Sequence, residues 1–194
     1  MQNLRFASLV LTALCVATAA AQESSHFEVF GGYSMERIAP CGALGSADHP
    51  CGVEAGFLPL TTTFNGWDAA FTGYFSKFVG ATADFSVHYG PNVPDNPDVG
   101  VQPSISRRSY MFGPVVAWRK SKLAPFAHVL LGRTSQTIGR SYAAFSWAVG
   151  GGLDASVSKR LAIRLADLDY ESVQVPGNAA ANGLRYSGGV VFRF

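Results

Sequence analysis

Residues 78–89 alternate between apolar side chains and side chains that are small or polar. Val79, Phe85 and Val87 fall on one face of this segment, and Thr82 and Asp84 fall on the other. Successive side chains of a β-strand point to opposite faces, so a period of two predicts a strand with two unlike faces.

The same alternation recurs in seven further segments, which makes eight strands in all. They cover 27–33, 66–75, 110–118, 127–131, 145–155, 161–165 and 184–194. Short links at 76–77, 119–123 and 158–160 alternate with long links at 35–63, 90–106 and 171–183 and with a shorter one at 136–141. Short turns at one end and longer loops at the other are typical of transmembrane barrels. The sequence therefore predicts an all-β protein, an eight-stranded antiparallel up-and-down transmembrane β-barrel with short periplasmic turns and longer extracellular loops.

The seventh strand does not keep its phase. Continuing the alternation beyond Leu165 would put Asp167 and Asp169 on the apolar face. A β-bulge near Ala166 or Asp167 would restore the pattern. Alternatively, the apolar face ends at Leu165 because the strand leaves the bilayer there. The sequence leaves both explanations open.

The two faces differ in volume and in charge, and this difference indicates which face is inside. One face carries Phe, Tyr, Trp, Val and Leu, whereas the other carries small residues and charges. A soluble eight-stranded barrel places its bulky side chains inward, which here would overfill the core. Small residues and paired charges instead suit a narrow lumen, since isolated buried charges are costly. We predict a lumen charge network that consists of Asp68, Asp84, Asp154, Arg164, Arg185 and Arg193.

Composition and charge agree with this interpretation. Hydrophobic residues make up 48% of the chain and charged residues 14%, which is below the roughly 25% charged content of soluble domains. The formal net charge is +2, without a run of basic residues. This pattern does not resemble the basic footprint of a nucleic-acid-binding protein, so we expect no nucleic-acid partner.

The N-terminal segment predicts export. Arg5 is followed by an apolar stretch and by small residues before Gln22, which is the pattern of a secretory signal peptide that directs the chain to the Sec route. We expect residues 1–21 to be cleaved and residues 22–194 to form the barrel domain. In an exported chain, Cys41 and Cys51 favour a disulfide. His49 between them makes only a weak zinc pattern, and we expect neither metal nor cofactor.

Four segments carry a resemblance to a known family. They are Phe27–Ser34, Asn65–Trp67, Leu165–Tyr170 and the closing Gly188–Phe194. The chain resembles the outer-membrane barrel family that includes the transmembrane domain of outer-membrane protein A and the opacity-type surface antigens. The resemblance implies location in the outer membrane of a Gram-negative-type bacterium, among outer-membrane lipid. It also implies a C-terminal targeting signal, formed by Tyr186, Phe192 and Phe194, for the outer-membrane assembly machinery. Because the sequence ends at Phe194, we expect no appended peptidoglycan-binding domain.

Three functions remain in competition for such a barrel. Some outer-membrane barrels modify lipid A with a Ser and a His near the membrane surface, and His88 with Asp84 and Ser86 is the arrangement here that comes nearest. A hydrogen-bonded lumen network explains these residues better, so we expect no enzyme. A narrow non-specific channel is disfavoured because eight strands enclose space only for their own side chains. We therefore expect a structural or adhesin-like role, with an extracellular partner that contacts the loops at 35–63 and 90–106.

Overall fold

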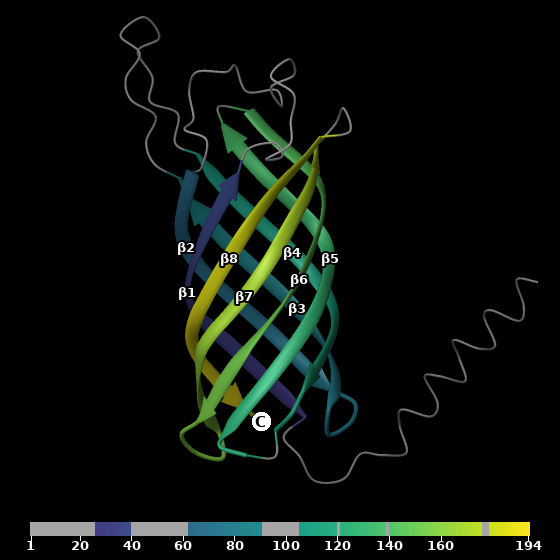
Figure 1. Cartoon of the computed structure of the whole chain (residues 1–194), viewed down its shortest axis with the longest axis vertical. Coiled ribbons are helices and arrows are strands. Elements are labelled where there is room, and N and C mark those ends of the chain that lie inside the picture. Colours follow the sequence, from purple (N-terminus) through teal and green to yellow (C-terminus); the bar gives the residue numbers. More distant parts are fainter. Residues whose placement is uncertain (1–25, 40–61, 91–104, 120, 139, 176–178) are drawn as a thin grey trace, which may run out of the picture.

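The computed structural model describes residues 26–39, 62–90, 105–119, 121–138, 140–175 and 179–194. Each strand pairs antiparallel with the next, and β1 pairs with β8, which closes the barrel (Figure 1). The predicted eight-stranded antiparallel barrel is thus confirmed. The strands are β1 (Phe27–Ala39), β2 (Thr62–Tyr74), β3 (Val79–Tyr89), β4 (Ser106–Ala117), β5 (Leu123–Ile138), β6 (Arg140–Ser156), β7 (Leu161–Val175) and β8 (Ala179–Arg193).

Among the described residues, no helix has the length and apolar character needed to cross a membrane.

The bulky side chains point outward and the polar ones point inward. Phe112 on the outer face of β4 is 68% exposed, whereas Asp84 on the inner face of β3 is 8% exposed. The exposed aromatic rings contact one another across strands, as in the pairs Trp67–Phe85 and Phe85–Tyr110. Closure of the barrel satisfies the backbone hydrogen bonds of every strand. The apolar side chains outside it are suited to contact with the hydrocarbon of lipid chains. The predicted assignment of the two faces is confirmed.

A β-bulge interrupts β7. The pairing of β7 with β8 shifts between Arg164 and Asp167, so that Leu165 and Ala166 together face Gly188. Beyond the bulge, Asp167 is buried, while Leu168 is 59% exposed. Of the two explanations for the lost phase, the bulge is therefore the correct one, because the extra residue returns the carboxylate to the lumen.

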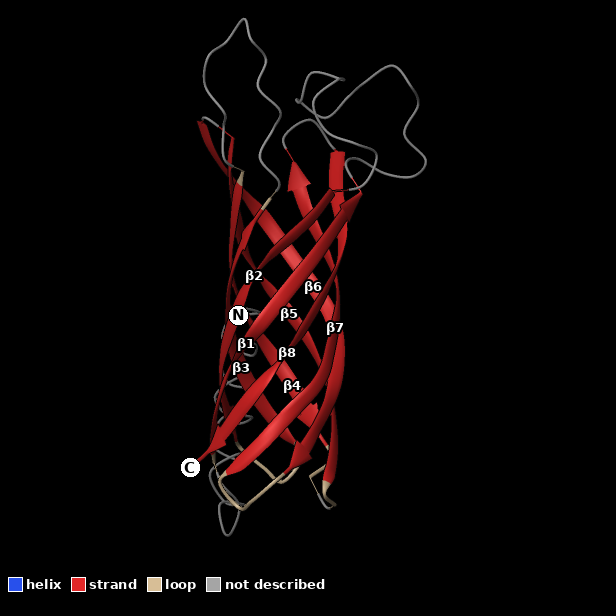
Figure 2. Cartoon of the chain, turned by 90° about the vertical axis from the view of Figure 1, so that its left-hand side faces the viewer, coloured by secondary structure: helices blue, strands red, loops and turns tan. Residues whose placement is uncertain are grey.

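The barrel has one end with tight turns, where the C-terminus also lies, and both views show the strands winding around one closed wall (Figures 1 and 2). In two of the turns the backbone closes with Phe75 N donating to Val79 O and Val157 N donating to Leu161 O. At the other end, the segments that join β1 to β2 and β3 to β4 contain residues 40–61 and 91–104, which lie outside the described residues.

Two of the predicted links, at 171–183 and 136–141, are much shorter in the structure. The segment 171–183 belongs mostly to strands, since β7 continues to Val175 and β8 begins at Ala179. The segment 136–141 is likewise divided between β5, which ends at Ile138, and β6, which begins at Arg140. The predicted link at 35–63 is also shorter, because β1 extends to Ala39 and β2 begins at Thr62. Backbone pairing continues where the regular alternation of bulky and small side chains fades.

Candidate functional site

The lumen holds all of the side-chain carboxylates in the described part of the chain, and each of these residues is less than 9% exposed. Five guanidinium groups pair with them there. Burial of so many charges is tolerated only when ion pairs and hydrogen bonds compensate for the lost water. The acidic residues are Glu28, Glu36, Asp68, Asp84, Asp154, Asp167, Asp169 and Glu171, and the basic residues are Arg107, Arg119, Arg164, Arg185 and Arg193.

Arg185 lies at the centre of the lumen and is 1% exposed. Its Nη1 lies 2.8 Å from Asp84 Oδ1 and 3.1 Å from Ser86 Oγ, both on β3. Its Nε and Nη2 lie 3.0 and 2.6 Å from Asp169 Oδ2 on β7. The other oxygen of Asp169, Oδ1, lies 2.6 Å from His128 Nε2 on β5. One guanidinium thus connects walls that do not adjoin in the sheet.

Glu28 organises the lumen near the end with the tight turns. Its Oε1 accepts hydrogen bonds from Arg193 Nε at 2.9 Å and from Arg119 Nη1 at 3.2 Å. Its Oε2 accepts a hydrogen bond from the Tyr74 hydroxyl at 3.3 Å. The guanidinium of Arg119 stacks over the Tyr74 ring, 3.7 Å from the ring centroid. Charge-assisted hydrogen bonds and a cation–π contact therefore close this end.

Arg164 forms the next layer. Its Nε donates to Asp154 Oδ1 at 2.9 Å, and its Nη1 donates to Asp167 Oδ2 at 3.0 Å. The guanidinium carbon lies 4.4 Å from the centroid of the Phe30 ring and 4.2 Å from that of Phe126. Two aromatic rings and two carboxylates thus hold this cation in place.

Arg107 forms the corresponding layer toward the opposite end. Its Nη2 lies 3.0 Å from Glu36 Oε1 and 2.7 Å from Glu171 Oε1. Above this layer, Ile38, Phe64 and Ile105 form a buried apolar cluster. The cluster covers the ionic interior on the side that carries the long connections.

The six residues of the predicted lumen charge network all lie on the inner wall, but they do not form one cluster. Arg185 pairs with Asp84. Arg164 pairs with Asp154, and Arg193 Nη2 lies 3.9 Å from the same carboxylate. Asp68 has no ion pair in the part of the chain that the structure describes, and its Oδ2 accepts a hydrogen bond from Ser187 at 2.7 Å.

Sequence reasoning missed several members of the network. Glu36 and Arg107 lie where the apolar alternation fades, and Asp169 and Glu171 follow the bulge of β7. One signal was available: the two-residue period continues from Ser34 to Glu36 and from Asp169 to Glu171. Extending the two-residue period beyond the segments of clear alternation would have placed these carboxylates on the inner face.

His88 contacts other residues than those the sequence suggested, since Asp84 and Ser86 both bind Arg185. Its Nε2 lies 2.8 Å from Ser34 Oγ, and its Nδ1 lies 3.7 Å from Glu36 Oε2. A serine, a histidine and a carboxylate in this order match the arrangement of an activated nucleophile. All three side chains are 0% exposed, however, and Ser34 Oγ also accepts a hydrogen bond from Ser187. A buried serine without access for a substrate fits a hydrogen-bond network better than a reaction centre.

One group of residues has the composition of a metal site. His128, Asp167 and Asp169 offer ligand atoms that lie within 4.8 Å of one another. Both oxygens of Asp169 are already occupied by His128 and Arg185, and Asp167 Oδ2 is occupied by Arg164. The ion pairs thus account for this cluster. The predicted disulfide of Cys41 and Cys51, the nearby His49 and the predicted signal peptide at 1–21 lie outside the described residues.

The residues of the predicted C-terminal targeting signal lie on the outer face. Phe192 and Phe194 are 52% and 70% exposed. The Tyr186 hydroxyl donates to Leu165 O at 3.1 Å. Phe194 N donates to Phe27 O at 2.9 Å, so the last residue helps to close the seam between β1 and β8. Recognition of these residues by the assembly machinery stays a prediction.

No family model matches the sequence, and no curated protein matches it. Solved structures of outer-membrane proteins do match the fold. The Neisserial surface protein A aligns with a TM-score of 0.63 at 14% identity, over 89% of this chain and 100% of that one. OprG from Pseudomonas aeruginosa aligns with a TM-score of 0.56 at 10% identity, over 90% of this chain and 98% of that one. Ail, the attachment invasion locus protein of Yersinia pestis, in complex with the heparin analogue sucrose octasulfate, aligns with a TM-score of 0.50 at 16% identity, over 89% of this chain and 100% of that one.

These similarities confirm the fold that the resemblance implied, which is the eight-stranded barrel of bacterial outer-membrane proteins. The apolar exterior and the polar interior are the physical counterpart of that fold. The chain therefore has the fold of the barrels of the bacterial outer membrane, and its apolar exterior is suited to surrounding lipid.

Proposed function

We propose that this protein is a non-enzymatic surface protein whose barrel is a rigid scaffold for contacts made by its long connections. The observation that carries the proposal is the lumen, where layers of ion pairs follow one another from Glu28 through Arg164 and Arg185 to Arg107. Charged groups held by two or more partners leave an eight-stranded barrel little freedom to open a path for solutes. The variable part of such a scaffold is its extracellular side.

Two observations bear on the kind of role. Strands β1 and β3 end, and β2 and β4 begin, at the end opposite the C-terminus and the tight turns (Figure 1). In outer-membrane barrels that end faces the cell exterior. The structure of Ail, the attachment invasion locus protein, was solved in complex with a heparin analogue. Together they favour a role in contact with a surface or polyanion outside the cell.

The test compares bacteria that display the wild-type chain with bacteria that display a variant in which residues 91–104 are replaced by a short Gly–Ser linker. We expect the variant to lose retention on immobilised heparin or on host-cell monolayers, with unchanged heat-modifiable gel mobility. Equal retention of both strains, with the same result after replacement of residues 40–61, would contradict the proposal. So would a steady single-channel conductance of the wild-type protein in planar bilayers.

A second candidate is a lipid-A-modifying enzyme, and the contact between Ser34 and His88 is the observation that favours it. Such an enzyme would require a reactive Ser34 and would release or move acyl chains of lipid A. Because Ser34 is buried, we expect no labelling of the folded protein by a fluorophosphonate probe. Labelling that disappears in Ser34→Ala, together with acyl release that disappears in His88→Ala, would instead establish the enzyme.

A further inference from the structure

The charges of the described residues are sorted by sign between the two sides of the wall. Every side-chain carboxylate lies in the lumen, whereas the exposed charged side chains are all cationic. Four of them, Lys77, Lys122, Lys159 and Arg160, lie at the end with the tight turns. The other three, Arg37, Arg108 and Arg133, lie on strands toward the opposite end. The exterior therefore complements an anionic membrane surface.

Arg108 and Arg133 are neighbours on adjacent strands. In the pairing of β4 with β5, Arg108 faces Ser135 and Tyr110 faces Arg133, so the two arginines are one diagonal step apart on the same outer face. Diagonal neighbours on one face of a sheet lie within reach of long side chains. Within the described ranges, neither guanidinium has an ion pair or a hydrogen bond to the protein. Two exposed cations thus lie side by side at the outer wall, without a carboxylate beside them among the described residues.

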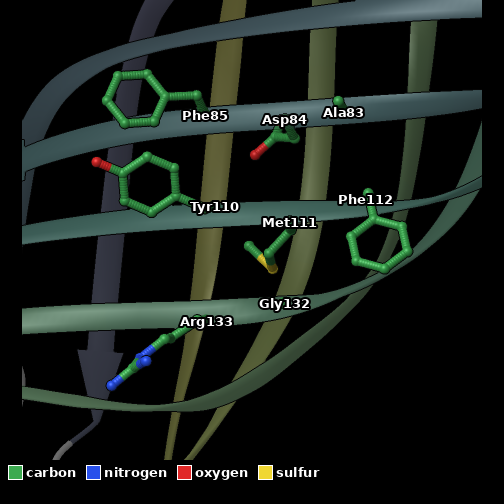
Figure 3. A pocket seen from close by; sticks show the side chains of 8 residues that line it. All are labelled: Ala83, Asp84, Phe85, Tyr110, Met111, Phe112, Gly132 and Arg133. Atoms are coloured by element: carbon green, nitrogen blue, oxygen red, sulfur yellow. The ribbon is translucent and has the colours of Figure 1, made fainter.

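A hollow in the wall adjoins this pair, and Arg133 is one of the residues that line it (Figure 3). Gly132 and Ala83 contribute almost no side-chain volume, while aromatic rings flank the space; the Phe85 and Tyr110 rings lie 4.8 Å apart between centroids. Figure 3 shows Phe85 beside Tyr110 on neighbouring strands, and Arg133 on the strand after them. The hollow is lined by Ala83, Asp84, Phe85, Tyr110, Met111, Phe112, Gly132 and Arg133. The side chains of Asp84 and Met111 are buried in the lumen, whereas Tyr110, Phe112 and Arg133 are exposed on the outer face.

The position of the site identifies the leaflet. Arg108 is the third residue of β4 after the connection that contains residues 91–104, so the pair lies toward the extracellular end of the strands. Tyr110, two residues further along β4, is an exposed aromatic residue of the kind that marks the interface of a membrane barrel. In the orientation on which the proposed function rests, the two arginines lie nearest the headgroups of the outer leaflet, and the hollow extends from Arg133 toward its acyl chains.

We propose that Arg108, Arg133 and the hollow below them bind lipid A, the phosphorylated glycolipid of the outer leaflet. Each guanidinium presents a planar fork of donors that matches phosphate oxygens. One acyl chain of the same molecule occupies the hollow against the aromatic rings. The arginine pair thus complements a phosphate of lipid A, and the hollow complements one of its acyl chains.

The experiment is native mass spectrometry of the full-length mature protein in detergent, titrated with bisphosphorylated lipid A. We expect Arg108→Gln/Arg133→Gln to weaken the apparent affinity by about tenfold, because two charge-assisted contacts to phosphate are removed. Ala83→Phe, which fills the hollow from the outer face, should weaken binding without removing a charge. The matched control is Arg37→Gln, an exposed arginine on β1 outside the site, which should bind like the wild type.

Each other outcome overturns the proposal. Unchanged affinity of the double variant would show that the arginine pair does not hold the phosphate. An equal loss in Arg37→Gln would show general attraction of anions to the wall. Equal competition by phosphatidylglycerol would show that any anionic lipid fits. Heat-modifiable mobility, measured on every variant, ensures that only folded barrels are compared.

Discussion

Arg185 of β8 and Asp84 of β3 meet across the lumen, with 2.8 Å between Nη1 and Oδ1. The two strands are separated in the sheet by β1 and β2, so the contact passes through the interior and not along the wall. The same guanidinium holds Asp169 of β7 at 2.6 Å. A single side chain thereby braces three strands of the barrel.

Removing this brace should destabilise the barrel strongly. Arg185→Leu leaves Asp84 and Asp169 buried without their cation, and breaking a buried pair in this way costs about 3–5 kcal/mol. Urea unfolding of the protein folded into lipid vesicles measures the loss. Arg160→Leu, which removes an exposed cation from a turn, serves as the control and should keep the wild-type midpoint. Equal midpoints for the two variants would show that the lumen pairs contribute no stability.

Gly150 makes room for the central carboxylate. A Cβ atom at this position would collide with Asp169 Oδ1 and with the backbone of Leu168, whereas a Cβ at Gly31 would meet nothing within 4 Å. We expect Gly150→Ala to lower the free energy of unfolding by about 1–3 kcal/mol, the usual cost of overpacking. Gly31→Ala should have little effect in the same urea titration. A destabilisation of similar size in both would point to a general cost of replacing glycine.

The bulge of β7 offers a test by deletion. Removing Ala166 leaves Leu165 alone opposite Gly188 and keeps Asp167 and Asp169 directed inward, because only the extra residue is lost. Removing Ala83 from the regular strand β3 instead reverses the faces of everything on one side of the deletion. We expect the first variant to refold with heat-modifiable mobility and the second to fail. If both fail equally, the register of β7 depends on more than the phase of its side chains.

The strands and the direction of their faces could be predicted because each transmembrane strand combines bulky and small residues at a strict period of two. Phe85 and Asp84 show this clearly, since one must face lipid and the other cannot. The upper parts of the strands could not be found in this way. Around Ser135 both neighbours are polar, and only the backbone pairing of the finished barrel shows that the strand continues.

The partners within the lumen were equally beyond the sequence. That Asp84 lies inside follows from its phase along β3, but its choice of Arg185 depends on how far neighbouring strands are staggered around the barrel. The same stagger brings Ser34 to His88, 54 positions away. Alternation fixes the face of a residue, whereas the shear of the barrel fixes its height.

The cysteine pair allows a direct chemical test. If Cys41 and Cys51 form the disulfide that the exported sequence favours, the mature protein should resist alkylation until it is reduced. Intact-mass measurement before and after reduction, with an alkylating reagent present, counts the free thiols. Cys41→Ser should then expose one reactive thiol without reduction. Full alkylation of the unreduced wild type would refute the disulfide.

The enclosure of every described carboxylate also determines how the barrel responds to its surroundings. Salt weakens ion pairs on a protein surface because counter-ions gather around each charge. Here the apolar cluster of Ile38, Phe64 and Ile105 lies toward one end, and Glu28 with its arginines lies toward the other, so the described ion pairs between them are buried away from the solvent. The free energy of unfolding of this barrel should therefore be similar at low and at high ionic strength.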